Sequence, residues 1–211
     1  MLDIDISCFL LWYFLLIAYI IIKIYTCNSK IEKKKSSLRT VLCVGSGGHT
    51  SELLRLFSTF DAKKYEPRLY ITANNDTSSG TKILRFEKVI GDDKYSISKI
   101  PRSRNVNQSF TSSIVSTLHS TLSTLPIILK FKPDVIICNG PGTCIPICFV
   151  AFMLRCLFIV DCRIVFIESI CRVRTLSLTG KILQYFADVF VVQWPQLKDV
   201  CHRAQYFGRL T

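Results

Sequence analysis

A glycine-rich turn at residues 45–50, Gly-Ser-Gly-Gly-His-Thr, contains the residue types best suited to chemistry in this chain. It follows an apolar run at 40–44, which is typical of a strand buried on both faces. Apolar side chains then recur at helical spacing between residues 53 and 57. A strand followed by a glycine turn and the first turn of a helix directs free backbone N–H groups to one place. This arrangement favours binding of an anion.

His49 lies where this turn joins the predicted helix at 51–57. An imidazole in that place can act as a general base on a hydroxyl group or hydrogen-bond a phosphate. The alternative is a helix-capping residue with no chemistry. Spacing alone does not distinguish the two roles.

The same turn argues against two nucleotide-binding motifs. A dinucleotide fingerprint needs a third glycine where Thr50 lies, and an acidic residue where the second strand ends at Thr72. A nucleoside-triphosphate P-loop needs a Gly-Lys-Thr/Ser ending, which the turn lacks. The sequence therefore predicts an anion site that is neither of these.

Strand-like and helix-like runs alternate along the rest of the chain. The predicted strands are 40–44, 66–72, 95–100, 133–138, 163–168 and 188–192. The further predicted helices are 81–87, 107–130 (with a kink at Pro126), 144–158 and 175–186. The alternation predicts an α/β fold with a doubly wound, mostly parallel, Rossmann-like sheet. The helix at 144–158 is too short to span a bilayer and is expected to be buried or to face a membrane.

In such a sheet, ligands bind beyond the carboxyl ends of the strands. Of the loops predicted there, two are rich in glycine, which allows close approach of the backbone, and two carry arginines, which match phosphate oxygens. At this point His49 stays a candidate for either of its two roles. The predicted substrate-binding residues are Gly45, Ser46, Gly47, Gly48, Thr50, Arg102, Arg104, Asn139, Gly140, Gly142, Thr143, Glu168 and Arg172. Glu168 can be an acid, a base or a ribose ligand, or its carboxylate can simply pair with Arg172 or Arg174.

Charge and cysteine content restrict the partners. Twenty-seven basic and fifteen acidic residues give a net charge of +12, which suits lipid headgroups or phosphates. Because no aromatic residues are interleaved with the loop arginines, no nucleic-acid partner is predicted.

Most of the ten cysteines lie in apolar runs, and none forms a C-x-x-C pair or a zinc-like array. We therefore expect reduced, cytosolic thiols, no metal and no cofactor.

An uncharged apolar run at 6–22 lies near the amino terminus. A helix of this length reaches about 26 Å, close to the thinner bilayer of the endoplasmic reticulum. Acidic residues precede the run and basic residues follow it, which places residue 23 onward in the cytosol, and an acidic start argues against a cleaved signal peptide. The predicted organisation is a transmembrane anchor (1–23), a basic juxtamembrane linker (24–38) and one domain (39–211).

Six motifs occur in order between residues 39 and 211. They are Gly45-Ser-Gly-Gly-His-Thr-x-Glu-Leu-Leu, Ser103-Arg-Asn-Val-Asn-Gln-Ser109, Asn139-Gly-Pro-Gly-Thr-Cys144, Glu168-Ser169, Leu176-Ser-Leu-Thr-Gly-Lys181 and Val192-Gln-Trp-Pro195. Together they closely resemble the membrane-anchoring subunits of the two-part UDP-N-acetylglucosamine (UDP-GlcNAc) transferases of asparagine-linked glycosylation.

The resemblance implies the acceptor-side half of a split GT-B glycosyltransferase. A soluble subunit would carry most of the UDP-GlcNAc site, and the heterodimer would add the second GlcNAc to GlcNAc-diphosphodolichol at the endoplasmic reticulum membrane. By the same resemblance, the chain would be single-pass with a lumenal amino terminus. The carboxyl-terminal segment would dock the partner, and His49 would be the candidate base for the acceptor 4-hydroxyl. The alternatives are a scaffold that contributes no catalytic group and a single-chain glycosyltransferase.

Overall fold

The structure is a computed structural model that describes residues 13–14, 17–18, 36–103, 108 and 110–210. The predicted transmembrane anchor (1–23) lies outside the described residues except at 13–14 and 17–18. The predicted linker (24–38) lies outside them except at 36–38, and Arg104 is also outside them.

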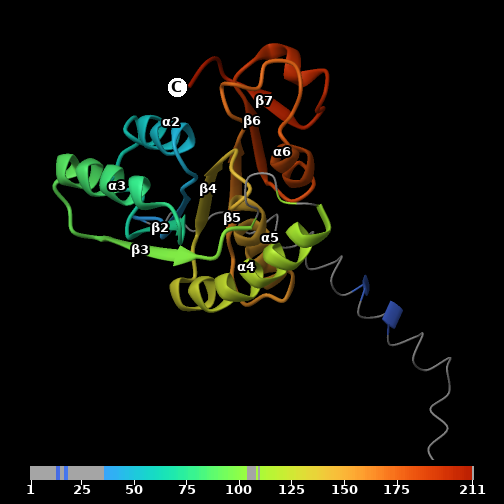
Figure 1. Cartoon of the computed structure of the whole chain (residues 1–211), viewed down its shortest axis with the longest axis horizontal. Helices are drawn as coiled ribbons and strands as arrows, with labels where there is room; N and C mark the ends of the chain where they lie inside the picture. Colours follow the sequence, from blue (N-terminus) through green and yellow to red (C-terminus); the bar gives the residue numbers. More distant parts are fainter. Residues whose placement is uncertain (1–12, 15–16, 19–35, 104–107, 109, 211) are drawn as a thin grey trace, which may run out of the picture.

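A seven-stranded, fully parallel sheet forms the middle of the domain. Its strand order is β3-β2-β1-β4-β5-β6-β7 (Figure 1). The strands are β1 (Thr40–Cys43), β2 (Arg68–Ala73), β3 (Tyr95–Ile100), β4 (Val135–Asn139), β5 (Arg163–Ile167), β6 (Val189–Val192) and β7 (Ala204–Tyr206). The first strand is central and fully buried, as its apolar run predicted.

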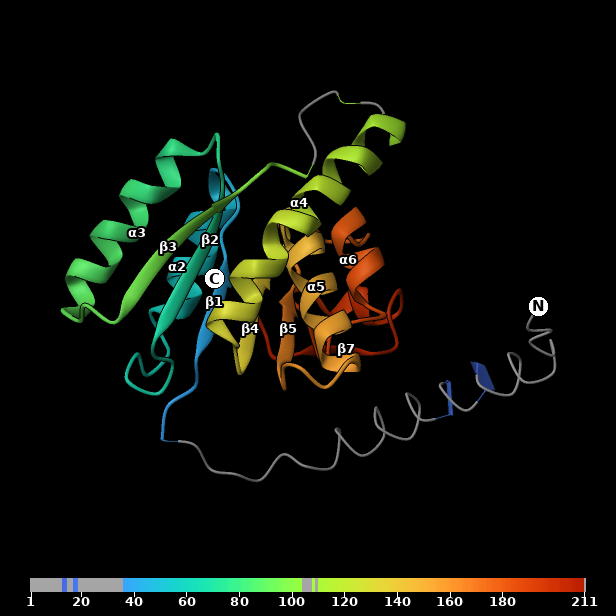
Figure 2. The same ribbon diagram turned by 90° about the horizontal axis from the view of Figure 1, so that it is seen from below.

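Helices cover both faces of the sheet, so the doubly wound prediction is confirmed. The helices are α2 (Gly48–Phe57), α3 (Thr77–Ile90), α4 (Phe110–Phe131), α5 (Cys144–Cys156) and α6 (Leu178–Leu183), with a 3-10 turn η1 (Pro195–Lys198). Leu42 and Val44 join the core with α2 and α3, whereas Val41 and Cys43 join the core with α4, α5 and α6. Figure 2 shows α4, α5 and α6 side by side. Alternate side chains of one strand thus contribute to two cores.

The strand order reverses between β1 and β4. From β1 the chain proceeds outward to β2 and β3 and then returns to β4 on the other side of β1. The two strands pair in register, with Cys43 beside Cys138, so their carboxyl ends are neighbours. At such a reversal the loops diverge and leave a crevice, which is the usual ligand site of this sheet type.

Two helices and one strand differ most from the predictions. Helix α3 begins at Thr77 rather than 81, because Asp76 caps it and accepts a hydrogen bond from the Ser79 N–H at 3.0 Å. Helix α6 has six residues, shorter than the predicted 175–186. The edge strand β7 was not predicted, because three residues are too few to show an alternation of apolar and polar side chains.

Helix α4 has an apolar outer face. From Thr111 onward it is the one helix among the described residues that is long and apolar enough to cross a bilayer by length and composition. Its inner residues Ser120, Thr124 and Ile128 are buried against the domain, whereas Leu118 and Leu122 are 59% and 62% exposed. It is therefore a surface helix whose apolar residues from Ile114 to Leu125 are largely exposed, the reverse of the usual arrangement, whereas those near its carboxyl end pack on the core. Pro126 lies within it.

Candidate functional site

A cavity of about 1030 Å³ opens at the carboxyl ends of the strands, where the order reverses. It is lined by the loops after β1, β2, β3, β4 and β5 and by α4, α5 and α6. Six of the predicted site residues line it: Ser46, Arg102, Gly140, Gly142, Thr143 and Arg172. The structure thus brings together loops that are far apart in the sequence, as the parallel sheet predicted.

The two glycine loops interlock. A Cβ atom on Gly45 would lie 2.6 Å from Cβ of Pro141, and a Cβ atom on Gly140 would lie 2.8 Å from Cε1 of His49. Gly140 also has a φ of 65°, in the left-handed region that favours glycine. The loops after β1 and β4 can touch only because these two positions lack side chains.

His49 lies at the rim of this cavity rather than on its wall. It is the second residue of α2, whose N-cap is Gly47, so the capping alternative is wrong. Its Nδ1 is 3.1 Å from Oδ1 of Asn139, and its side chain is 38% exposed. With Asn139 in this orientation, Nδ1–H donates to Oδ1, and Nε2 is left as the basic atom. The imidazole ring lies against Gly140, which lines the cavity, but His49 itself does not line it.

Glu52 fixes the loop after β5 to the helix that carries His49. It was not among the site residues predicted from the sequence. Its buried carboxylate accepts hydrogen bonds from the Ile170 N–H at 2.7 Å, from Ser169 Oγ at 3.0 Å and from Gln193 Nε2 at 2.8 Å. It also lies 3.9 Å from Nδ1 of His49. One helical carboxylate therefore holds the loop that carries Arg172. The Glu-Leu-Leu run after the glycine turn was the available signal, but its helical periodicity did not show which loop Glu52 reaches.

Glu168 is structural in this arrangement. It is fully buried and accepts hydrogen bonds from the N–H and hydroxyl of Ser177 and from the Ser169 N–H. Burial raises the pKa of its carboxyl group above the ordinary value, although these bonds partly oppose the shift. Its oxygens therefore bind the loop and the start of α6 rather than an arginine, and they do not line the cavity.

The polar loop after β2 supports the glycine turn from the other side. Thr50 is buried, and its hydroxyl bonds the Gly45 carbonyl and, at 2.6 Å, the Ser79 hydroxyl. Ser79 in turn donates to the Gly45 carbonyl and to Asp76. Thr50 therefore shapes the turn without lining the cavity, whereas Asp76 lines it.

Asp76 is a second carboxylate to weigh as a base. Burial alone would raise its pKa, but hydrogen bonds from Ser79 and Ser78 outweigh burial and lower the pKa below the ordinary value. Both carboxylate oxygens already accept hydrogen bonds. A carboxylate stabilised in this way is a poor proton acceptor, so Asp76 acts as a cap on α3.

The cavity wall supplies cations and spare hydrogen-bonding groups. Arg102 and Arg172 lie on opposite loops of the wall. Ser103 Oγ, on this wall, is buried and has no hydrogen-bond partner within the described part of the chain; Asn139 Nδ2 also has none there, but Asn139 does not line the cavity. Guanidinium groups recognise phosphate oxygens well, and an unpaired buried polar group is costly until a ligand satisfies it. These features suit an anionic, hydrogen-bonding ligand.

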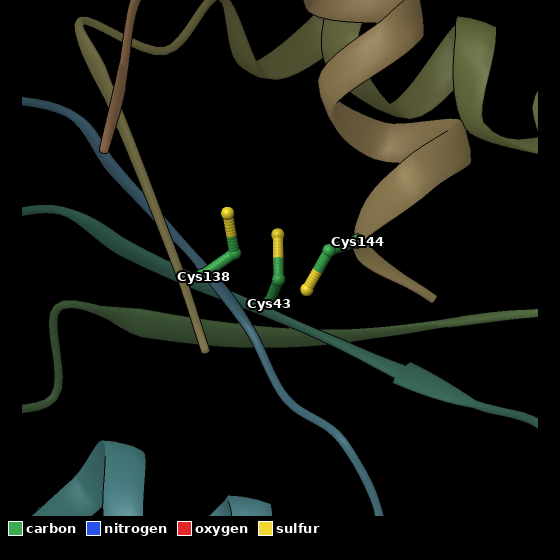
Figure 3. Close-up of side chains that lie close together, drawn as sticks. All are labelled: Cys43, Cys138 and Cys144. Atoms are coloured by element: carbon green, nitrogen blue, oxygen red, sulfur yellow. The ribbon is translucent and has the colours of Figure 1, made fainter. Parts of the chain in front are cut away.

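Three thiols converge behind the glycine loops, one each from β1, β4 and α5 (Figure 3). The sulfur atoms of Cys43, Cys138 and Cys144 lie within 4.8 Å of one another, the one such metal-sized cluster among the described residues. Burial raises the pKa of Cys43 well above its ordinary value. Burial also opposes ionisation of Cys144, but hydrogen bonds from Cys138 and Cys43 lower its pKa to about 7. A metal bound by all three sulfur atoms would need three thiolates, and so further ionisation at a site away from water. We therefore interpret the cluster as apolar packing. The absence of a metal stays a prediction.

Replacing Gly140 with alanine is expected to displace His49 from Asn139. The new Cβ would clash with the imidazole ring, and the positive φ would destabilise the fold by about 1–2 kcal/mol. Gly142→Ala is the matched control, because a Cβ there meets nothing within 4 Å. NMR signals of the His49 ring and thermal unfolding measure both effects. Equal changes in the two variants would contradict the interlocked-loop account.

Asp76→Asn keeps a capping side chain but removes its charge, so it is expected to lower the free energy of unfolding by about 0.3–1 kcal/mol at neutral pH, the usual contribution of a negative charge at a helix N-terminus. Because the folded pKa lies below the unfolded value of about 3.9, the contribution of the carboxylate is present above that value. It is lost as the pH falls through the folded pKa. Denaturant unfolding of both proteins across pH 7 to 3 should show the difference shrinking toward acid. A difference that grows toward acid would refute this.

Two solved structures share the fold. MurG from Acinetobacter baumannii superposes with a TM-score of 0.55 at 15% identity, covering 75% of this chain and 42% of MurG. UDP-N-acetylglucosamine 2-epimerase from Rickettsia bellii gives a TM-score of 0.51 at 14% identity, covering 82% of this chain and 45% of the epimerase. This chain thus spans less than half of each structure. The expected Rossmann-like fold is confirmed.

Sequence relatives match over most of their own length. The UDP-N-acetylglucosamine transferase subunit ALG14 of Mus musculus is 45% identical over 184 residues, which is 83% of this chain and 84% of the mouse protein. The Homo sapiens subunit is 46% identical over 183 residues, with the same coverage of each chain. The family model described as oligosaccharide biosynthesis protein Alg14 like matches residues 40–210. With this match and these identities, the chain belongs to the Alg14-like family.

Proposed function

We propose that this chain is the membrane-anchoring, acceptor-binding subunit of a UDP-GlcNAc transferase that adds the second GlcNAc to GlcNAc-diphosphodolichol. The observation that carries the proposal is the cavity beside the two interlocked glycine loops, which is lined by Arg102 and Arg172. Family membership supports the reaction class, because the mouse and human relatives are named as transferase subunits. A single sheet supports the division into two chains, since a separate donor domain is needed to close the cleft.

In the proposed reaction, the cavity holds the acceptor diphosphate through backbone N–H groups of the glycine loops and the two arginines. The 4-hydroxyl of the acceptor GlcNAc attacks the anomeric carbon of UDP-GlcNAc, and UDP leaves with the electron pair of the broken bond. Nε2 of His49 takes the hydroxyl proton. The partner subunit binds the nucleotide and excludes water from the closed site.

The proposed location is the cytosolic face of the endoplasmic reticulum membrane. Residues 1–23 would anchor the chain with a lumenal amino terminus, and residues 24–38 would link the anchor to the domain at 39–211. The composition of the amino-terminal run and the net charge of +12 support this arrangement. The carboxyl-terminal segment is the proposed docking element for the soluble subunit.

A scaffold without a catalytic group is the second candidate. The observation in its favour is that His49 does not line the cavity. In that case the partner would supply the base, and this chain would bind and orient the acceptor only. Single-chain catalysis is disfavoured, because all seven strands among the described residues belong to one sheet.

A transfer assay with UDP-GlcNAc and GlcNAc-diphosphate-phytanyl tests both candidates. We expect transfer only when this chain and its soluble partner are combined. His49→Ala should lower kcat by about 10²-fold or more while the complex stays assembled, because a positioned base contributes that much. His119→Ala is the control, since His119 is an exposed histidine of α4 outside the cavity.

Each alternative gives a different result in that assay. Transfer by this chain alone would overturn the split-enzyme proposal. An unchanged kcat in the His49→Ala complex would favour the scaffold and assign the base to the partner. A loss of assembly rather than of kcat would place His49 at the subunit interface.

A further inference from the structure

The cavity has two chemically different ends. The loops at the carboxyl edge supply its polar end, with Arg102, Thr143 and Arg172. Helices α4, α5 and α6 supply the other end, which is mainly apolar but also carries the hydroxyl residues Ser113, Thr117, Thr121 and Thr179. Its apolar lining residues are Ile114, Leu118, Ile145, Phe149, Leu178 and Ile182.

The apolar end continues onto the surface of the protein. Ile114 is 70% exposed, Leu118 59% and Leu178 52%, so these side chains both line the cavity and face outward. No Asp, Glu, Lys or Arg occurs in α4 before Lys130. Figure 2 shows the amino-terminal end of α4 extending beyond α5 and α6. An exposed apolar stripe of this kind is a liability in water unless a ligand or surface covers it.

Sugars and free phosphates present too little apolar surface to cover these side chains. A hydrocarbon chain attached to a diphosphate would satisfy both ends of one cavity at once, because the anion would bind the loops and the chain would lie against the three helices. Burying apolar side chains against such a chain is favourable in proportion to the area removed from water.

We propose that the apolar end of this cavity binds the first isoprenoid units of the acceptor lipid. Ile114, Leu118, Phe149 and Leu178 are then specificity-determining residues that select acceptors by their lipid chain. This inference rests on the proposed function and deepens it. The occupant is the substrate's own chain, and the continuity of the apolar wall with the diphosphate end carries the assignment.

Leu118 and Leu122 provide a matched pair of variants. Both are apolar residues of α4 with nearly equal exposure, 59% and 62%, yet only Leu118 lines the cavity. Substitution of either by serine removes the same apolar group from the helix surface. A chain-binding subsite should respond to Leu118→Ser alone, whereas docking of the helix onto a bilayer should respond to both.

The experiment compares two acceptors in the reconstituted complex, GlcNAc-diphosphate with a phytanyl chain and with a short isopentenyl chain. For the phytanyl acceptor we expect Leu118→Ser to lower kcat/KM about tenfold, mainly through KM, which corresponds to about 1.4 kcal/mol. For the isopentenyl acceptor the loss should be less than about twofold, since the shorter chain reaches fewer of these side chains. Leu122→Ser should stay within about twofold for both.

Two results would overturn the inference while leaving the proposed function intact. One is an equal loss in both variants, which would assign the stripe to the membrane. The other is no loss in Leu118→Ser with the phytanyl acceptor. If the wild-type complex transfers to neither acceptor, the proposed function itself fails. Photolabelling of this full chain with a diazirine-bearing farnesyl diphosphate then decides the subsite, because labelling within residues 114–121 supports it and labelling confined elsewhere refutes it.

Discussion

The contact between two glycine loops organises the site. Parallel pairing of β1 and β4 brings the loops together, and the absence of side chains at Gly45 and Gly140 lets them touch. That contact places Asn139 within hydrogen-bond distance of His49. Glu52 then ties the loop that carries Arg172 to the same helix as His49. Three loops from distant parts of the sequence therefore form one unit, and a shift in one is transmitted to the imidazole.

The position of this unit fits the proposed division of the enzyme between two chains. The imidazole of His49 remains 38% exposed at the cavity rim, and the arginines face a space that the described domain leaves open. A partner that closes this space would exclude water and strengthen each charge interaction there. The helices beside the cavity add an apolar wall, so the same opening suits a lipid-linked substrate held at a membrane.

Residues 40–57 could be predicted from the sequence, because an apolar run, a glycine turn and a helical repeat each have a local signal. The cavity lining by Leu118 could not be predicted, since periodicity does not show which helix face looks outward. Glu52 reaches Ile170 across more than a hundred residues, and only the three-dimensional fold reveals that bond. The sequence put His49 at the glycine turn, but its contact with Gly140 and its absence from the cavity lining depend on packing that spacing does not encode.

The most direct measurement is equilibrium binding of GlcNAc-diphosphate-phytanyl to this full chain in lipid nanodiscs, without the partner and without UDP-GlcNAc. If the chain is the acceptor-side half, binding is saturable and free inorganic diphosphate competes for it. Acceptor binding that appears only after the soluble partner is added would contradict the account, because the acceptor site would then belong to the partner or to the interface.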